Sequence, residues 1–434
     1  MGRDSILTSG QEKLDNWGFT LPWVRKEVVA EGTWFSARKH AKEVSPVRLI
    51  SGLLVLAAVS VCAQPIFIGF QGPLTGPWAV EGDWALKSIQ IAVEIVNARG
   101  GVLGRPIQLI VEDDGGSPKG GVLAAQKLIA AGVKFVVGTY GSMVCMPSSE
   151  LYEEAEVLHI NYGCTRVDLS ARGFKYYFRT SGRDDTQARF FVEYVIPLFG
   201  AKRIAVMHDN TAYALGVAED VLRFMKPLLD AGQVKLVYYD AIMPGERDYT
   251  PALTALRDAD PDIWYYTGYY PEWALLLRQG KDLGLDWKKI KAVGSNACPI
   301  SEAVKIAGLD AVVGAMITQE PLPAFLVEKY PLAKEFVTAY EAKYGPIHDS
   351  PWATYAADAV FTLVFAFEAT KSLDPKGVAK YLRTGIIVDE GITGPLSFSP
   401  EGDRLGIPYM LLICTETGES ALFDPAVHGR LVGM

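Results

Sequence analysis

The chain has few of the residues that metal-dependent and nucleic-acid-binding proteins rely on. Of 434 residues, 5 are histidine and 5 are cysteine. No two cysteines form a CxxC pair, so a structural zinc site is not expected. Acidic residues outnumber basic ones, 50 to 42, and the net charge of -8 argues against a nucleic-acid partner. No P-loop sequence occurs, and no GxGxxG follows the first predicted strand, so we expect no nucleotide and no other cofactor.

Long apolar runs are also scarce, and the one near the N-terminus is short. The run 49–63 follows Arg48 and ends in small residues. It is shorter than the roughly 20 residues that a spanning helix needs. A positive start, a short apolar core and a small-residue end predict a secretory signal peptide at 47–63, cleaved after its last residue. A lipid anchor at Cys62 is the alternative, and the bulky Val61 before it argues against that anchor.

The position of this signal defines the exported part of the protein. Residues 1–46 precede it, and we interpret them as a non-native or disordered extension. The exported part keeps four cysteines: Cys145, Cys164, Cys298 and Cys414. Because exported proteins can form disulfides, the sequence allows two alternatives: a disulfide between Cys145 and Cys164, or free buried thiols.

Short apolar strands alternate with helices over most of the exported part. The expected strands are 65–70, 107–114, 134–140 and 157–163 in a first series, then 202–209, 235–242, 262–268 and 291–296 in a second. Such alternation predicts parallel sheets with helices on both faces. The two series indicate two similar lobes. Toward the C-terminus we expect helices at 332–345 and 350–370, followed by hairpins within 391–419.

Polar and small residues gather where these strands end, and tyrosine is prominent among them. In open parallel sheets, ligands bind beyond the carboxyl ends of the strands. Tyrosine offers an apolar wall with one polar tip, which suits a cleft around a small solute. The candidates are Tyr140 to Ser142, Tyr162 to Thr165, His208, Asp209, Tyr213, Gly268 to Tyr270, and Gly294 to Asn296.

The same strand ends do not form a catalytic or metal-binding pattern. Ser142 follows a glycine, but its surroundings lack the GxSxG sequence of a nucleophile elbow. His208 and Asp209 are neighbours on a strand, so their side chains point to opposite faces. The side chains of the acidic residues 112–114 also point to alternate faces of a strand, so they cannot all meet at one metal ion. We therefore expect neither an enzyme nor a metal site.

Four segments together resemble the leucine/isoleucine/valine-binding branch of the periplasmic solute-binding proteins. They are "NARGGVLGRPIQLIVEDD", "KRIAVMHDNTAYALGVAED", "DYTPALTALRDADPDIWYYTGYYPEWALLLRQ" and "ITGPLSFSPEGD". The resemblance implies an α/β fold of type I: two Rossmann-like lobes with parallel sheets, joined by a three-crossover hinge near 183, 320 and 396. The implied N-terminal lobe is 64–183 with 320–396, and the C-terminal lobe is 184–319 with 397–434.

The function implied by this resemblance is solute binding for an ABC uptake transporter. The protein would be a periplasmic or extracytoplasmic monomer that delivers a branched-chain or related amino acid to a membrane permease. By analogy, Ser142 and Thr165 hold the carboxylate, while the Gly163 carbonyl and Thr165 contact the ammonium. The implied ligand-binding set is Trp78, Tyr140, Ser142, Gly163, Cys164, Thr165, Tyr213, Tyr269 and Asn296.

One position departs from the family pattern. Asn296 stands where the family has an acidic partner for the ammonium, and an amide does not repay desolvation of a buried ammonium as a carboxylate does. Glu81 or Glu320 could substitute for it. Otherwise the solute lacks an ammonium and is a short amide, urea, or an aromatic or aliphatic acid, which Arg166 and Trp78 favour. A ligand sensor of the same fold is a further alternative.

Overall fold

The computed structural model describes residues 64–434. The predicted extension, signal peptide and Cys62 lie outside the described residues. Two large sheets carry most strands, in the orders β2-β1-β3-β4-β5 and β14-β13-β10-β9-β8-β6-β7. The first sheet is parallel throughout, with β1 paired to both β2 and β3. In each sheet the second strand of the lobe lies on one side of the first, and the third lies on the other side. The strand order therefore reverses at β1 in the first sheet and at β6 in the second.

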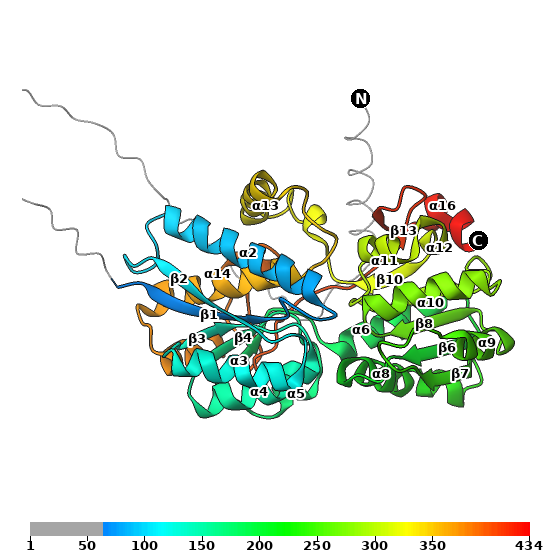
Figure 1. The fold of residues 1–434 in the computed structure, drawn as a ribbon, viewed down its shortest axis with the longest axis horizontal. Helices are drawn as coiled ribbons and strands as arrows, with labels where there is room; N and C mark the ends of the chain where they lie inside the picture. The colour runs from blue at the N-terminus through cyan, green and yellow to red at the C-terminus, as the bar shows by residue number, and fades with distance from the viewer. Residues whose placement is uncertain (1–63) are drawn as a thin grey trace, which may run out of the picture. The chain divides into compact units, whose positions relative to one another are not determined.

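The first lobe is the five-stranded sheet with the elements packed on it. Its elements are β1 (Ile66–Gly72), α2 (Ala79–Ala98), β2 (Ile107–Asp113), α3 (Pro118–Ala130), β3 (Phe135–Val137), α4 (Ser142–Glu154), β4 (Leu158–Asn161), α5 (Asp168–Ala171), β5 (Tyr177–Arg179), α13 (Pro331–Tyr344), α14 (Trp352–Thr370), α15 (Pro375–Leu382), β11 (Glu390–Gly391) and β12 (Gly394–Pro395). In Figure 1, α2 lies beside α14 and α3 beside α4, on opposite faces of this sheet.

The second lobe is built in the same way around the seven-stranded sheet. Its elements are α6 (Asp184–Phe190), the π-helix η1 (Phe191–Val195), α7 (Ile196–Leu198), β6 (Arg203–His208), α8 (Ala212–Asp230), β7 (Lys235–Ala241), α9 (Thr250–Asp258), β8 (Ile263–Thr267), α10 (Tyr270–Asp282), β9 (Lys291–Gly294), α11 (Ile300–Ala307), α12 (Leu309–Val312), β10 (Met316–Gln319), β13 (Met410–Cys414), β14 (Ser420–Leu422), α16 (Pro425–His428) and the 3-10 helix η3 (Gly429–Val432); a further 3-10 turn, η2 (Pro323–Phe325), follows β10.

Alternation along the strands sends apolar side chains to both faces of each sheet. On β6, Ile204 and Val206 belong to one core cluster, while Ala205 and Met207 belong to another. Since helices cover both faces, every one of these side chains is buried. Burying a large apolar side chain contributes about 1.5–3 kcal/mol, so strands of this type stabilise both layers at once. The predicted two-lobe α/β architecture is confirmed.

Several details differ from the sequence-based expectation. The second sheet is mixed, because β13 pairs antiparallel with β10 and with β14; the expected C-terminal hairpin has joined the sheet edge. Strands β5 and β10 were not predicted. None of the helices within residues 64–434 is long and apolar enough to span a bilayer. The four cysteines of this part of the chain are free and buried.

Candidate functional site

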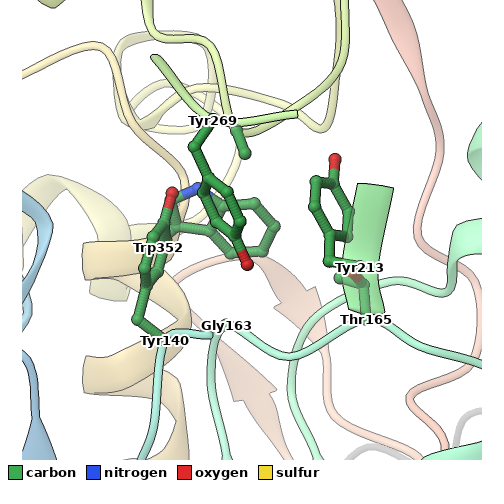
Figure 2. Close-up of a pocket in the computed structure, with 7 residues that line it drawn as sticks. Tyr140, Gly163, Thr165, Tyr213, Tyr269 and Trp352 are labelled. Atoms are coloured by element: carbon green, nitrogen blue, oxygen red, sulfur yellow. The ribbon is translucent and has the colours of Figure 1, made fainter. Parts of the chain in front are cut away.

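Seven residues from both lobes line a small gap. The empty space within it, open solvent included, is about 170 Å³. Tyr140, Gly163, Thr165 and Trp352 come from the first lobe, and Tyr213, Tyr269 and Ala297 from the second. Figure 2 shows the Tyr269 ring between the rings of Tyr140 and Tyr213. Both lobes therefore contribute side chains to the gap.

Six of these residues follow the carboxyl ends of strands. Tyr140 comes after β3, and Gly163 and Thr165 come after β4. In the second lobe Tyr213 follows β6, Tyr269 follows β8 and Ala297 follows β9. Strands β3, β6 and β8 border the points where the strand order reverses, and β4 and β9 are the next strands along; open α/β sheets bind ligands at such points. Strand geometry therefore explains why residues far apart in sequence meet here.

Stacked and tilted rings form one wall of the site. The Trp78 ring lies 4.3 Å from that of Tyr269 and 5.8 Å from that of Tyr140. Trp352 in turn lies 5.9 Å from Tyr140. All four side chains are buried, and the Tyr140 hydroxyl has no hydrogen-bond partner in the described part of the chain. Trp78 thus backs the ring of Tyr269 instead of lining the gap itself.

Unpaired hydroxyls lie at the start of α4 and after β4. Ser142 is the first residue of α4, and both its hydroxyl and that of Thr165 are buried without a partner among residues 64–434. The first intrahelical bond of α4 runs from the Val144 N–H to the Gly141 carbonyl, so the N–H groups before it are free of helical partners. A helix N-terminus carries partial positive charge. This corner is therefore suited to an anion such as a carboxylate.

The loop after β4 is held by Asn161. Its side-chain oxygen accepts from the N–H groups of Gly163 and Cys164, both at 2.8 Å. A Cβ at Gly163 would lie 2.8 Å from the Cα of Tyr140, so this close approach requires glycine. The Cys164 thiol donates to the Thr139 carbonyl at 3.3 Å and packs beside Cys145, away from the gap. Of the two, only Gly163 reaches the gap.

A buried carboxyl that the sequence analysis did not select lies behind Thr165. Asp184 begins α6, and its N–H donates to the Thr165 carbonyl at 3.0 Å. The side chain is 1% exposed, and neither carboxyl oxygen makes a hydrogen bond of good geometry within the described residues, although the Thr165 hydroxyl lies near enough to lower the pKa of Asp184. Burial raises the pKa of Asp184 to about 8, against the opposing effects of Thr165 and Arg179. Among the charged groups, Asp184 acts most strongly on the pKa of Tyr213. Asp184 is therefore a buried acid behind Thr165, on the side of Gly216 in α8, and it does not itself line the gap.

Asn296 belongs to a buried network at the hinge. Its side-chain oxygen accepts from the Tyr213 hydroxyl at 2.6 Å. Its amide donates to both Glu320 oxygens, at 3.2 and 3.1 Å. Tyr409 donates to Glu320 at 3.0 Å. Burial raises the pKa of Glu320 to about 7, opposed by its hydrogen bonds. Asn296 thus orients Tyr213 from behind, and Glu320 lies one layer further back.

Arg166 does not face the gap. Its guanidinium donates twice to Asp168, at 2.8 Å each, and to the carbonyl of Ala212 at 2.7 Å. The idea that Arg166 selects an acidic solute is therefore not supported by its contacts. The bond to Ala212 joins the two lobes, as does the bond from the Tyr270 hydroxyl to the Pro77 carbonyl at 2.9 Å.

The structure brings together five of the nine predicted residues around the gap: Tyr140, Gly163, Thr165, Tyr213 and Tyr269. Trp78, Ser142 and Asn296 lie directly behind or beside them, and the Cys164 side chain points away. Trp352 and Ala297 were missed. Ala297 adjoins the predicted Asn296, while Trp352 opens a helix nearly two hundred positions after Gly163, and no local signal marks it.

Comparison with known sequences places these features in context. The sequence profile described as "Periplasmic binding protein" matches residues 65–419. A Leu/Ile/Val-binding protein homolog of Brucella melitensis is 35% identical over 361 residues, covering 82% of this chain and 94% of that protein. The leucine-, isoleucine-, valine-, threonine- and alanine-binding protein of Pseudomonas aeruginosa is 33% identical, with 84% and 94% covered.

Solved structures agree with these sequence matches. The leucine binding protein LivK of Thermotoga maritima superposes with a TM-score of 0.74 at 26% identity, covering 83% of this chain and 98% of that one. The substrate binding protein LivJ of Streptococcus pneumoniae, in complex with isoleucine, gives a TM-score of 0.73 at 25% identity, with 82% and 97% covered.

Proposed function

Because the chain belongs to the periplasmic binding protein family, we propose that it is the solute-binding subunit of an ABC uptake transporter for a branched-chain or related amino acid. The single observation that carries this proposal is the small gap lined by strand-end residues of both lobes. A solute there contacts both lobes and so favours the closed state over the open one. Such a site binds a solute without changing it, and no catalytic role is proposed.

In this proposal the carboxylate of the solute lies at the start of α4. Ser142 and Thr165 supply hydroxyl donors that are buried and unpaired in the described residues. Buried polar groups without partners are costly, so a ligand that satisfies them gains affinity. The helix N-terminus adds favourable electrostatics for an anion.

The ammonium of the solute lies between the Gly163 carbonyl, Thr165 and Asp184. Asn296 cannot supply a negative charge, and its amide is already engaged with Glu320. Asp184 is buried and adjoins Thr165, and neither of its carboxyl oxygens makes a hydrogen bond of good geometry within the described chain. A bound ammonium would hydrogen-bond to this acid and favour its ionised form. In this proposal Asp184 is the acidic partner of the ammonium, in place of the acid that the family has at the position of Asn296.

The hinge in this proposal is formed where three chain crossings meet. The Tyr409 hydroxyl donates to Glu320, and a Cβ on Gly182 would lie 2.9 Å from that hydroxyl and 3.1 Å from a Glu320 oxygen. We place the last crossing between Arg404 and Tyr409 instead of near 396, because the Arg179 N–H donates to the Gly402 carbonyl at 2.9 Å. The lobes are then 64–183 with 320–404, and 184–319 with 409–434.

Family membership also implies an extracytoplasmic location and a membrane permease as partner. We propose that residues 47–63 direct export as a cleaved signal peptide, and that the exported protein acts as a monomer. Mass spectrometry of protein secreted by the native host would give the mature N-terminus. An N-terminus at Gln64 supports the proposal, and one at Cys62 bearing lipid supports the anchored alternative.

Thermal unfolding with a panel of solutes tests the binding function. Ligands that bind only the native state raise the melting temperature. The panel contains the natural amino acids, short amides, urea, and aromatic and aliphatic acids. We expect one or more amino acids to raise the melting temperature of the wild type. This rise should be lost in Asp184→Asn and kept in Asp185→Asn. Asp185 is the matched control because its carboxylate pairs with Arg183. A response only to acids or amides without an ammonium would contradict the amino-acid assignment.

A further inference from the structure

One carboxylate of the first lobe accepts three hydrogen bonds from the second lobe. Asp349 lies in the segment between α13 and α14. Its Oδ2 accepts from the Ser301 N–H at 3.0 Å and from the Ser420 hydroxyl at 2.6 Å, and its Oδ1 accepts from the Ser301 hydroxyl. Ser301 belongs to α11 and Ser420 to β14. Two separate elements of the second lobe therefore meet at one side chain of the first.

Helix α11 has no N-terminal cap from its own lobe. Its N-cap position is Pro299, whose side chain makes no capping hydrogen bond. The first N–H groups of a helix lack intrahelical acceptors, and a capping side chain normally satisfies one of them. Asp349 supplies that acceptor to Ser301, the second residue of the helix, from across the lobe boundary. The negative charge of Asp349 also suits the positive end of the helix. The cap of α11 is therefore complete only in the closed form.

The segment that carries Asp349 is fixed to the first lobe on both sides. His348 stacks on Trp84 of α2, with ring centroids 4.0 Å apart and an interplanar angle of 9°. The Ser350 hydroxyl donates to the buried Glu81 carboxyl of α2 at 2.8 Å. A segment anchored in this way cannot follow the second lobe when the cleft opens. Opening must therefore break the three hydrogen bonds to Asp349.

The same segment leads directly into the solute site. Trp352, which lines the gap, follows Asp349 by three positions and opens α14. On the α11 side, the Nζ of Lys305 lies 5.9 Å from the ring centroid of Trp84, at the range of a cation–π contact. Asp349 itself does not line the gap. Its influence on a solute therefore passes through the position of the lobes and not through contact.

We propose that Asp349, with Ser301 and Ser420, forms a latch that keeps the closed form populated in the absence of solute. Asp349 is then a positioning residue for solute binding. This inference rests on the proposed function, and it adds how the closed cleft is held. The measured Kd equals the Kd of the binding-competent form divided by the fraction of molecules in that form. The latch raises this fraction for every solute alike, so it sets affinity and not selectivity.

Small-angle X-ray scattering of the empty protein tests the latch without any solute. We expect the radius of gyration of Asp349→Ala to exceed that of the wild type, because the lobes separate once their shared carboxylate is removed. Asp374→Ala is the matched control, since Asp374 caps α15 within the first lobe by accepting from the Gly377 N–H at 3.0 Å. The radius of this control should equal that of the wild type. Equal radii for the wild type and Asp349→Ala would overturn the inference.

Calorimetric titration of Asp349→Ala separates the latch from the proposed function. Every solute that binds the wild type should bind this variant about tenfold more weakly, the loss expected for one hydrogen bond to a charged group. The ratios between the Kd values of different solutes should stay the same. An unchanged Kd, or a changed ratio, would contradict the latch and leave the proposed function intact. If no solute binds the wild type, the proposed function fails, and the scattering result still decides the latch.

Substitutions in the second lobe test the latch from its other side. The double variant Ser301→Ala and Ser420→Ala removes two of the three donors and keeps Asp349, so its radius of gyration should also exceed that of the wild type. It takes the place of Asp349→Ala should that variant not fold. Added to Asp349→Ala, the two serine substitutions should cause no further increase, because their shared partner is already absent. A further increase would show that the serines act without Asp349, which would refute the latch.

Discussion

The amide of Asn296 donates to both carboxylate oxygens of Glu320, at 3.2 and 3.1 Å. On its other side Asn296 accepts the Tyr213 hydroxyl at 2.6 Å. A tyrosine that lines the gap is thereby linked through one side chain to a carboxylate at the hinge. Hydrogen bonds therefore connect Tyr213, which a ligand would contact, with Glu320 at the hinge.

Asn296→Asp should destabilise the protein without improving binding. The new carboxylate would lie about 3 Å from Glu320, and two buried carboxylates at that distance cannot both ionise readily. Their pKa values rise above those of the unfolded chain, so stability falls as pH increases above about 4.5. The drop in melting temperature should be larger at pH 8 than at pH 5. Asn210→Asp, on an exposed residue of the same lobe, is the control. An equal drop at both pH values would argue against direct contact between the introduced carboxylate and Glu320.

Loss of the hinge carboxylate should affect stability and binding together. Glu320→Ala leaves the buried Asn296 amide and Tyr409 hydroxyl without this acceptor, which costs about 2–3 kcal/mol of unfolding free energy. Because Asn296 then holds Tyr213 less firmly, solute binding should weaken about tenfold. Denaturant unfolding and calorimetry measure the two effects, with the exposed Glu328→Ala as control. Unchanged affinity in a destabilised variant would uncouple the hinge from the site.

Removal of one hydroxyl at the start of α4 should reduce affinity selectively. Ser142→Ala deletes a buried donor that has no partner in the described chain, so the empty protein should lose little stability. The complex loses a hydrogen bond to a carboxylate, worth about 1.5–3 kcal/mol, or roughly 10–100-fold in Kd. Thr338→Ala, at an exposed position of α13, is the comparison. Wild-type affinity in Ser142→Ala would place the carboxylate elsewhere.

Glu81 should make the empty protein less stable as pH rises. Its pKa is raised by burial to about 8 in the folded state, from 4.5. Between these values the unfolded chain releases its proton while the folded chain keeps it, so folding becomes less favourable with increasing pH. Glu81→Gln removes this loss. At pH 8 the free energy of unfolding of the variant should exceed that of the wild type by on the order of 3 kcal/mol, and at pH 4 the two free energies should differ little. Glu94→Gln, at an exposed position of the same helix, is the control, and an identical stability curve for both variants would contradict the burial of Glu81.

Local patterns account for much of the fold and for part of the site. Apolar strands ending in small or polar residues predicted both sheets and placed Tyr140, Gly163, Thr165, Tyr213 and Tyr269 at their carboxyl ends. This succeeded because parallel sheets bring such ends to one edge. The edge strands β13 and β14 were read as a separate hairpin, since nothing in their sequence shows which strand they pair with.

The remaining site residues depend on contacts that sequence spacing does not show. Trp352 reaches the gap only because the chain returns to the first lobe. Asp184 begins a helix, a position where acids are common, and its burial is evident only in three dimensions. Arg166 stands close to the predicted site in sequence, but its guanidinium is paired with Asp168 two residues later.

Titration calorimetry with three related compounds tests the central claim most directly. The compounds are the amino acid of the panel that binds most tightly, its carboxamide, and the acid that lacks the α-amino group. The account predicts that the amino acid binds to one site per chain, and that either deletion weakens binding by about 100-fold or more, since each removes charged hydrogen bonds in a buried site. Equal or tighter binding of the acid without its amino group would contradict the pairing of Asp184 with an ammonium.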